Sequence, residues 1–149
     1  INTADEMLLE VKNLINKIDI FIGCAAVADF KPIDFNTSKI KKNEDDEISL
    51  KLTKNPDILE YASDHMKDKI VIGFSAETDN VIENAKIKLL KKNLNMIICN
   101  DVSDKTIGFD SNDNEVHLIT HDDVIKLSKT TKLKIAKQII KSIESLISE

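Results

Sequence analysis

Three short apolar runs, each of strand length, constrain the fold of this chain more than any other feature. They span residues 18–25, 69–74 and 95–99. Helical periodicity precedes the first run and separates the second from the third, at residues 79–92. Strands that alternate with helices indicate an α/β fold with a mainly parallel sheet. We therefore expect the first run to be a strand that is covered on both faces.

Local signals predict two helix starts. Thr3 and Glu6 have the spacing of a capping box, so a helix should follow Thr3. Asn55 and Pro56 predict a second start, with Asn55 as the N-cap and Pro56 in the first helical position. Just before them, residues 47–53 alternate polar and apolar side chains, which predicts a half-exposed strand.

The last third of the chain changes character. Residues 116–120 and 124–128 are short apolar strands separated by the turn-forming residues 121–123, which predicts an antiparallel hairpin. An amphipathic helix should follow at about residues 130–147. With no repeat or linker in sight, residues 1–149 are expected to belong to a single domain.

An aspartate and a group of lysines follow the first apolar run. The run gives way to Asp29, and Pro32 should prevent a helix or strand from continuing. Lys39, Lys41 and Lys42 come next. Ligands bind at the carboxyl edge of open α/β sheets, so this pattern suits a nucleotide, with the acid on the ribose or base and the lysines on the phosphates. The alternative is a turn aspartate followed by solvated lysines.

Composition excludes several functional classes. The net charge of −5 argues against a general nucleic-acid binder. All 21 basic residues are lysine, which leaves lysines, backbone amides and metal ions to contact phosphate. No apolar run approaches the roughly 18 residues of a membrane span, and no signal peptide begins the chain, so we expect a cytoplasmic protein.

The cysteines and histidines do not indicate a metal site. Cys24 and Cys99 each lie at the end of an apolar run and are expected to be reduced. His65, His117 and His121 show no metal-ligand spacing with them. The sequence therefore predicts no metal bound directly by a His/Cys cluster.

Five motifs occur in the order found in a known ligase family. They are residues 25–32 with Lys39, residues 54–59, residues 73–78, Lys88 with Lys92, and residues 100–103 with Gly108 and Phe109. Together they resemble phosphopantothenoylcysteine synthetase, which joins phosphopantothenate to cysteine in coenzyme A biosynthesis. The resemblance covers roughly residues 1–145 and implies a Rossmann-like, three-layer fold.

The resemblance also implies a reaction and its ligands. CTP, with Mg²⁺, would activate 4'-phosphopantothenate as an acyl-cytidylate, which L-cysteine would then attack. Residues 1–149 would be the C-terminal part of the ligase domain. Its first strand, glycine-rich segment and intermediate-processing asparagine would lie upstream. A homodimer is implied, as is a possible fusion to a decarboxylase domain that binds FMN and is not in this sequence.

The resemblance assigns site residues by position. It places CTP on Gly23, Cys24, Ala25, Asp29, Lys39, Asn55, Pro56, Asp57, Ile58, Phe74, Lys88 and Lys92. Lys39 is the expected catalytic residue, which stabilises the activated intermediate. Without the resemblance, a core role for Phe74 stays open, and Glu77 could either cap a helix or contact magnesium through water. The residues alone do not decide between CTP and ATP.

A rival interpretation is a non-catalytic α/β module that binds a nucleotide or mediates dimerisation. An exposed alternating strand at residues 48–52 could pair with a partner chain. The two interpretations differ in whether catalytic turnover is expected.

Overall fold

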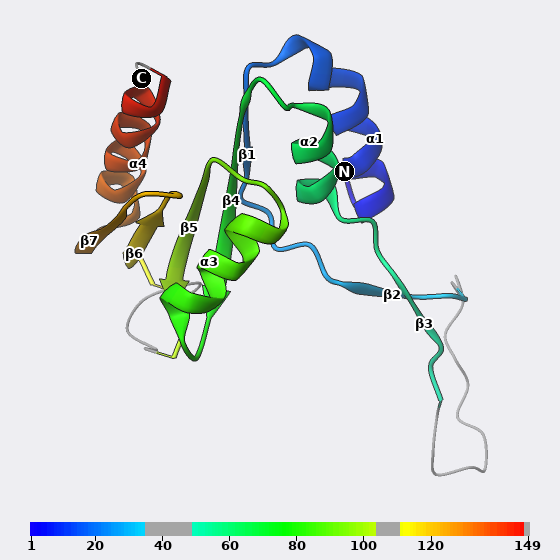
Figure 1. Ribbon diagram of the computed structural model, residues 1–149. Helices are drawn as coiled ribbons and strands as arrows, with labels where there is room; N and C mark the ends of the chain where they lie inside the picture. Colours follow the sequence, from blue (N-terminus) through cyan, green and yellow to red (C-terminus); the bar gives the residue numbers. More distant parts are fainter. Residues whose placement is uncertain (35–48, 104–110, 148–149) are drawn as a thin grey trace.

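The computed structural model describes residues 1–34, 49–103 and 111–147, which form a five-stranded sheet with helices on both faces and a two-stranded arm (Figure 1). The helices are α1 (Ala4–Leu14), α2 (Ile58–His65), α3 (Val81–Lys91) and α4 (Lys132–Ile147), with a 3-10 turn at Ile15–Lys17. The strands are β1 (Ile20–Gly23), β2 (Phe30–Pro32), β3 (Leu52–Lys54), β4 (Ile70–Glu77), β5 (Met96–Asp101), β6 (Asp113–Ile119) and β7 (Val124–Thr131).

The sheet has the strand order β1-β4-β5-β6-β7. Strands β1, β4 and β5 run parallel, with Gly23 opposite Gly73 and Glu77 opposite Asp101. The last two strands pair antiparallel, β6 on β5 and β7 on β6. The prediction of a mainly parallel sheet with an antiparallel C-terminal hairpin is confirmed.

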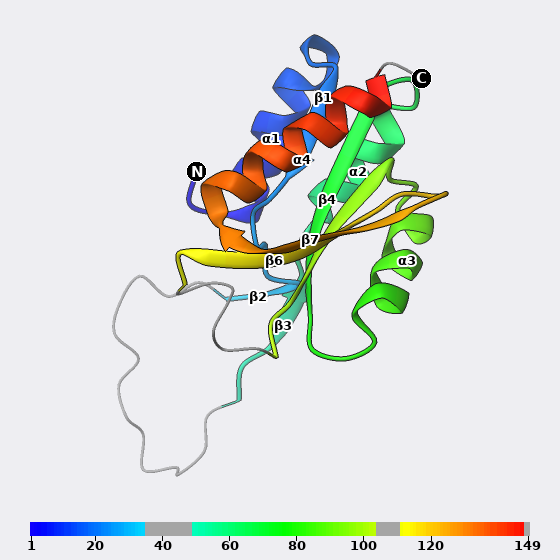
Figure 2. The same ribbon diagram turned by 90° about the vertical axis from the view of Figure 1, so that its left-hand side faces the viewer.

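Two hydrophobic clusters fill the spaces on either side of the sheet. Alternate residues of β4 face opposite clusters: Val71 packs with α1, α2 and α3, whereas Ile72 packs with α4. The core of the α4 side includes Ile135, Ile139 and Ile143, which are spaced so that they share one helix face. Figure 2 shows α4 lying across the sheet, so the expected three-layer architecture is confirmed.

Strand β1 is less buried than the sequence suggests. All four of its residues are only partly buried, because β1 is the edge strand and has β4 as its neighbour in the sheet. Helix α4 contacts β6 and β7, at the other side of the sheet. Phe21 nevertheless packs against one cluster, and Ile20 and Ile22 pack against the other, so both faces of β1 are covered as predicted, although less completely than in a central strand.

Strands β2 and β3 form an arm that projects from the body of the molecule (Figure 1). All three residues of β3 are exposed. The half-exposed strand predicted at residues 47–53 is confirmed only near its end, and residues 47 and 48 lie outside the described part. Strand β2 ends at Pro32, which agrees with the expectation that no strand continues past this proline, and a missing N–H is tolerated at this position.

Helix ends agree with the local signals in one case and differ in others. The capping box at α1 is confirmed, because Thr3 Oγ1 accepts from the Glu6 amide at 3.1 Å and Glu6 Oε2 accepts from the Thr3 amide at 3.2 Å. Helix α3 begins two residues later than predicted, after Asn80 in the left-handed region with φ of 44°. Within the described ranges, no helix is both long and apolar enough to span a bilayer.

Candidate functional site

A cavity of about 790 Å³ opens at the carboxyl ends of β1 and β4. Its lining comes from the loop after β1, the segment leading into α2, the end of β4 and the last turn of α3. The lining includes Gly23, Ala25, Asp29, Asn55, Pro56, Asp57, Ile58, Phe74, Lys88 and Lys92. We call this space the edge cavity. Its position is the one at which parallel α/β sheets bind ligands.

The edge cavity brings together all the predicted CTP-binding residues except Cys24 and Lys39. Cys24 is exposed and lies between two lining residues, Gly23 and Ala25. Partial burial raises the pKa of its thiol, which does not favour a nucleophilic role. Lys39, like its neighbours at positions 41 and 42, lies outside the described residues. The convergence is established, whereas nucleotide binding itself stays a prediction.

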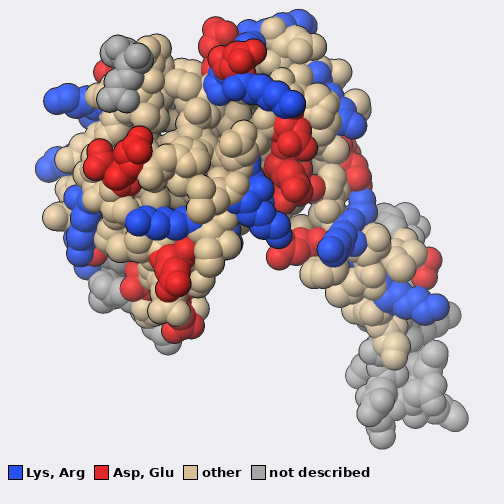
Figure 3. Space-filling model, viewed as in Figure 1, with Lys and Arg blue, Asp and Glu red and all other residues tan. Residues whose placement is uncertain are grey.

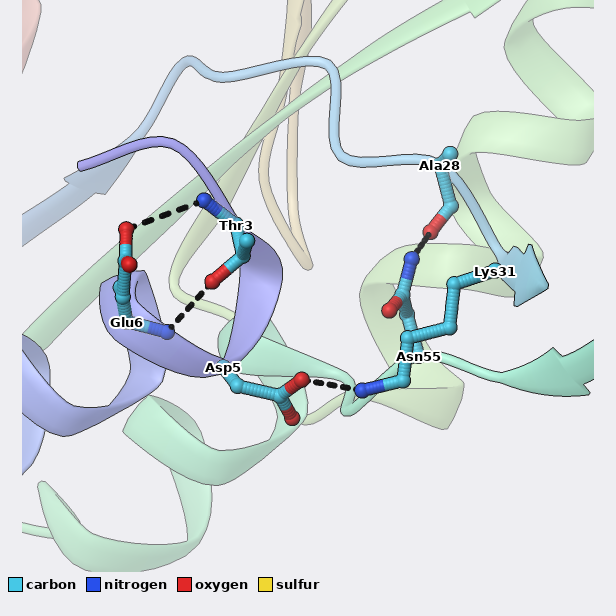
Figure 4. A network of polar contacts seen from close by, with 6 residues as sticks. All are labelled: Thr3, Asp5, Glu6, Ala28, Lys31 and Asn55. Carbon is cyan, nitrogen blue, oxygen red and sulfur yellow. Dashed lines mark hydrogen bonds and ion pairs between the residues drawn. The ribbon is translucent and has the colours of Figure 1, made fainter. Parts of the chain in front are cut away.

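Asn55 ties the loop after β1 to the entrance of α2. Its side-chain Nδ2 donates to the Ala28 carbonyl oxygen at 2.8 Å, and its backbone amide donates to the Asp29 carbonyl oxygen at the same distance. Figure 4 shows this contact beside the ion pair between Lys31 and Asp5, which links the arm to α1. Asn55 therefore positions the segment that carries Asp29 against the segment that carries Asp57.

Helix α2 begins two residues later than the sequence indicates. The N-cap is Asp57, whose carboxylate accepts from the Glu60 amide at 3.0 Å, and the helix starts at Ile58. The prediction of Asn55 as the cap was wrong, because tertiary contacts with the loop after β1 occupy its amide group. A carboxylate already satisfies one free amide at this helix end, so the end offers less positive potential to a phosphate.

Two paired glycines let α2 approach the sheet. A Cβ atom on Gly73 would lie 2.7 Å from Leu59 Cδ2, and one on Gly23 would lie 3.3 Å from Leu59 Cδ1. Both glycines therefore make room for the first turn of α2. The resemblance assigns Gly23 to CTP, and the structure adds helix packing as a separate reason for a small residue there.

Two lysines of the α3 end are held by carboxylates. Lys88 Nζ lies 2.6 Å from Glu77 Oε1, and Lys92 Nζ lies 2.7 Å from Asp57 Oδ2. The sequence placed both lysines on one helix face but did not reveal their partners, because these come from distant segments. Figure 3 shows basic and acidic side chains side by side where the body of the molecule meets the arm. At least two of the cavity's charged residues, Lys88 and Lys92, thus lie beside a carboxylate of opposite charge.

The pKa of Asp57 reflects opposing effects. Partial burial alone would raise the pKa, but the Lys92 ammonium and the amide of Glu60 favour the charged form. Their combined effect holds the pKa of Asp57 below its ordinary value. Asp57 is therefore a carboxylate at neutral pH and stays paired with Lys92.

Phe74 lies on the cavity rim but packs in the core. Strand β4 continues to Glu77, so the prediction that Phe74 ends the strand was wrong. Its side chain packs with the cluster beneath α4, whereas the residues of α2 and α3 lie on the opposite face. A contact between Phe74 and a nucleotide in the edge cavity would therefore involve its backbone or ring edge more readily than a full stacked face.

Metal-binding geometry and turn capping complete the description of this sheet edge. Among the described residues, no group of three or more His, Cys, Asp or Glu side chains is placed to hold a metal ion. At the end of β5, Asp101 Oδ1 accepts from the Ser103 amide at 2.9 Å, which is the capping role that the sequence left open. Asn100 lies opposite Ala76 in the sheet.

A second cavity, of about 740 Å³, adjoins the first. The two share Met7, residues 25–28 and Asn55 in their linings. The second cavity extends past Lys31 and Pro32 to the start of α1. Sequence reasoning did not find this space, because it forms where the loop after β1 meets the start of α1, two segments whose contact leaves no signal in the sequence.

Comparisons with known proteins agree with this fold. The family described as DNA/pantothenate metabolism flavoprotein C-terminal domain matches residues 1–147. The chain is 45% identical over 143 residues to the coenzyme A biosynthesis bifunctional protein CoaBC of Borreliella burgdorferi, covering 95% of this chain and 36% of that protein. It is 45% identical over 124 residues to CoaBC of Escherichia coli K12, covering 80% of this chain and 30% of that protein.

A solved structure supports the same relationship. The crystal structure of the C-terminal domain of CoaBC matches with a TM-score of 0.79 and 32% identity, covering 99% of this chain and 64% of that one. The chain spans about a third of the length of the two curated relatives. Because the family match covers almost the whole sequence, this chain belongs to the DNA/pantothenate metabolism flavoprotein C-terminal domain family.

Proposed function

We propose that this chain is the CTP-binding part of a phosphopantothenate–cysteine ligase of coenzyme A biosynthesis. Family membership supports the proposal, since the curated relatives are named as coenzyme A biosynthesis proteins. The observation that carries it is the edge cavity, whose lining includes all but two of the residues that the sequence resemblance assigned to CTP. These residues come from separate segments, so their convergence is a property of the fold.

The proposed reaction has two halves. A carboxylate oxygen of 4'-phosphopantothenate attacks the α-phosphorus of CTP, a new P–O bond forms, and the bond to the β-phosphate breaks to release pyrophosphate. The cysteine amine then attacks the acyl carbon and loses a proton, and CMP leaves with the electrons of the broken C–O bond. The activation step is needed because a free carboxylate is a poor acyl donor.

The residues of the edge cavity have distinct proposed roles. Lys88 and Lys92 contact the phosphates, because ammonium groups from one helix face can reach neighbouring oxygens. The backbone of residues 55–58 holds the nucleoside, and Asp29 accepts from ribose or base donors. Lys39 stabilises charge that develops at the α-phosphate. The adjoining second cavity is large enough to admit the acyl substrate.

Magnesium is proposed to accompany CTP. Each of the two cavity lysines is paired with a carboxylate, so these pairs contribute little net positive charge. The described part of the chain also holds no ready metal-binding cluster. The donor set therefore fits an ion bound mainly by phosphate oxygens and water. When bound, the ion neutralises charge on the triphosphate.

Calorimetric titration tests the nucleotide assignment. The full-length protein should bind CTP with magnesium more tightly than ATP with magnesium. Equal or tighter binding of ATP would remove the cytidine assignment and leave the ligase class standing. Pyrophosphate release with phosphopantothenate, CTP and cysteine tests the reaction, and residues 1–149 alone are expected to show negligible turnover.

The catalytic assignment of Lys39 needs its own test. Lys39→Gln should slow acyl-cytidylate formation by about 100-fold, as expected for loss of one oriented charge-stabilising donor. Lys42→Gln is the matched control and should cost less than about tenfold, since exposed charges are screened. Single-turnover kinetics with CTP titration separates activation from binding. Loss of activation in Lys42→Gln, with Lys39→Gln unaffected, would contradict the assignment.

A homodimer formed through the arm is the proposed assembly. Phe30, Leu50 and Leu52 are each more than half exposed there, which is unusual for several large apolar residues on one small element. Strand β3 also ends the short ladder and could continue pairing with a partner chain. Analytical ultracentrifugation of Leu52→Lys should show a shift from dimer to monomer, whereas an unchanged dimer would place the interface elsewhere.

The exposed arm is also the observation that favours the second candidate function, a non-catalytic binding or dimerisation module. Both functions allow CTP binding and dimerisation. Multiple-turnover formation of phosphopantothenoylcysteine by the full-length protein separates them, because a module would give none.

A further inference from the structure

Glu77 lies behind one of the cavity lysines. It is the last residue of β4, and its side chain is only 11% exposed, whereas the Lys88 side chain is 47% exposed. Lys88 lines the edge cavity, but Glu77 does not belong to its described lining. The contact of 2.6 Å between Glu77 Oε1 and Lys88 Nζ therefore joins a cavity lysine to a residue outside the described lining.

The backbone that carries Glu77 is held in place by β5 and the residue that follows it. Glu77 pairs with Asp101 of β5, and its carbonyl oxygen accepts from the Val102 amide at 3.0 Å. A lysine side chain has four rotatable bonds and loses substantial conformational entropy when it is fixed. A mostly buried acceptor on a paired strand end can fix the ammonium before any ligand arrives.

We propose that Glu77 is a positioning residue that holds the Lys88 ammonium at the wall of the edge cavity, ready for the phosphates of the nucleotide. This inference rests on the proposed function of that cavity. An ammonium group has three N–H donors, so one can stay on Glu77 while the others reach phosphate oxygens. Glu77 thus acts through Lys88 and does not itself touch the ligand.

The second lysine pair differs in this respect. Asp57 lines the edge cavity, is 38% exposed on its side chain and also caps α2. Its negative charge faces the ligand space, so it both orients Lys92 and repels a polyanion. The two pairs share the same chemistry, but only Glu77 supports its lysine from behind. Neutralising Glu77 should therefore weaken phosphate binding, without the opposing gain that removal of a negative charge from the cavity lining would give.

A double-mutant cycle on the full-length protein tests the proposal. The variants are Glu77→Gln, Lys88→Gln and both together, and the probes are Mg·CTP and magnesium tripolyphosphate in calorimetry. Glu77→Gln should raise the Kd for both probes about fivefold, and the double variant should bind no more weakly than Lys88→Gln alone. In steady-state assays, KM for CTP should rise while kcat stays the same.

Glu115→Gln is the matched control. Glu115 forms an ion pair of similar length, 2.8 Å, with Lys126 on the β6–β7 hairpin, and neither residue lines the edge cavity. This variant should leave both Kd values unchanged. Thermal unfolding of each variant checks that Glu77→Gln still folds.

Several outcomes would overturn the proposal. One is an unchanged Kd in Glu77→Gln. Another is a rise in Kd from Glu77→Gln that is equally large when Lys88 is already replaced by glutamine, because Glu77 would then act through the strand end and not through Lys88. Failure of the proposed function looks different: the protein would bind tripolyphosphate but would form no phosphopantothenoylcysteine, and the cycle would still be decided with tripolyphosphate. Binding of neither probe would remove both.

Discussion

The two halves of the sheet bury similar side chains but differ in what their strand ends do. In the parallel half, β1 and β4 end at the edge cavity, and the segments that follow them supply most of its lining. In the antiparallel half, β6, β7 and α4 enclose a core of comparable composition, but none of their described residues lines that cavity. Parallel strands end at one edge and bring their loops together, whereas antiparallel strands divide their loops between two edges.

The difference teaches that burial and binding are separable in this molecule. Both halves contain surface ion pairs. In the described part of the chain, Lys88–Glu77 and Lys92–Asp57 place their lysines at the cavity, while Lys126–Glu115 lies on the hairpin. Variants of the antiparallel half should therefore change stability without changing nucleotide binding. Variants of the parallel half should change nucleotide binding, either together with stability or without any change in stability.

The largest expected effect comes from shortening one core residue in each half. Leu89 of α3 is 2% exposed and Ile139 of α4 is 6% exposed. Replacing either by alanine should lower the free energy of unfolding by about 3 kcal/mol, because apolar contacts are lost and a cavity is left. Urea denaturation measures this loss.

The same two variants should differ in CTP binding. Leu89→Ala loosens the helix turn that carries Lys88, so the Kd for Mg·CTP should rise, whereas Ile139→Ala should leave it unchanged under conditions in which the protein is folded. Calorimetry makes the comparison. An equal rise in Kd for Ile139→Ala would show that the two halves are not separable.

A second effect, of about 1–2 kcal/mol, is expected for Gly73→Ala. The new Cβ would approach Leu59 Cδ2 to 2.7 Å and Leu94 Cδ1 to 3.0 Å, so both side chains must shift. Because Leu59 belongs to the first turn of α2, CTP binding should weaken as well. Adding Leu59→Ala should relieve the clash and restore part of the affinity; if affinity falls further instead, the close approach of α2 does not position the site.

Neutralising single lysines should affect binding by about tenfold, which corresponds to about 1.4 kcal/mol. Lys88→Gln and Lys92→Gln should each raise the Kd for Mg·CTP by that factor, with little change in activation rate. Lys126→Gln, on the hairpin, should change neither quantity. If it weakens binding as much as Lys92→Gln does, the charge effect is general and the site assignment fails.

The smallest expected effect is on the pH dependence of stability. The pKa of Asp57 is lowered from 3.8 and that of Glu115 from 4.5, so each stabilises the fold above its ordinary pKa and loses that contribution as the pH falls through the lowered value. Lys92 and Lys126 are the respective ion-pair partners. Because both carboxylates are partly exposed, each contribution should be well under about 1 kcal/mol.

Asp57→Asn keeps a residue that can cap α2, so it isolates the charge. Urea midpoints measured from pH 7 down to pH 3 should fall less steeply in Asp57→Asn than in the wild type, and Glu115→Gln should behave in the same way. An unchanged slope in both variants would show that these pairs do not stabilise the folded state.

Much of the fold could be predicted from periodicity. The capping box at Thr3, the parallel strands, the C-terminal hairpin and α4 all follow from local signals that tertiary contacts did not override. The errors have identifiable causes. Asn55 uses its amide group on Ala28 instead of capping α2, and β4 continues past Phe74 to Glu77 because it pairs with β5 there.

The site was predictable as a set of residues but not as a geometry. Motif order identified Asp29, Lys88 and Lys92, and the edge cavity brings them together. The sequence did not reveal that Glu77 supports Lys88 or that Asp57 holds Lys92, because ion pairs between distant segments leave no periodic signal. The position of the predicted catalytic Lys39 lies outside the described residues and stays a prediction.

The sequence by itself determined the class of fold, the order of its elements and the residue types available to a nucleotide, because these depend on local periodicity, capping and motif order. Only the tertiary structure decided which carboxylate faces which lysine, that Phe74 packs beneath α4, and that paired glycines admit Leu59 to the sheet. Such features depend on the close packing of segments far apart in the chain, and close packing is specified by all its members at once.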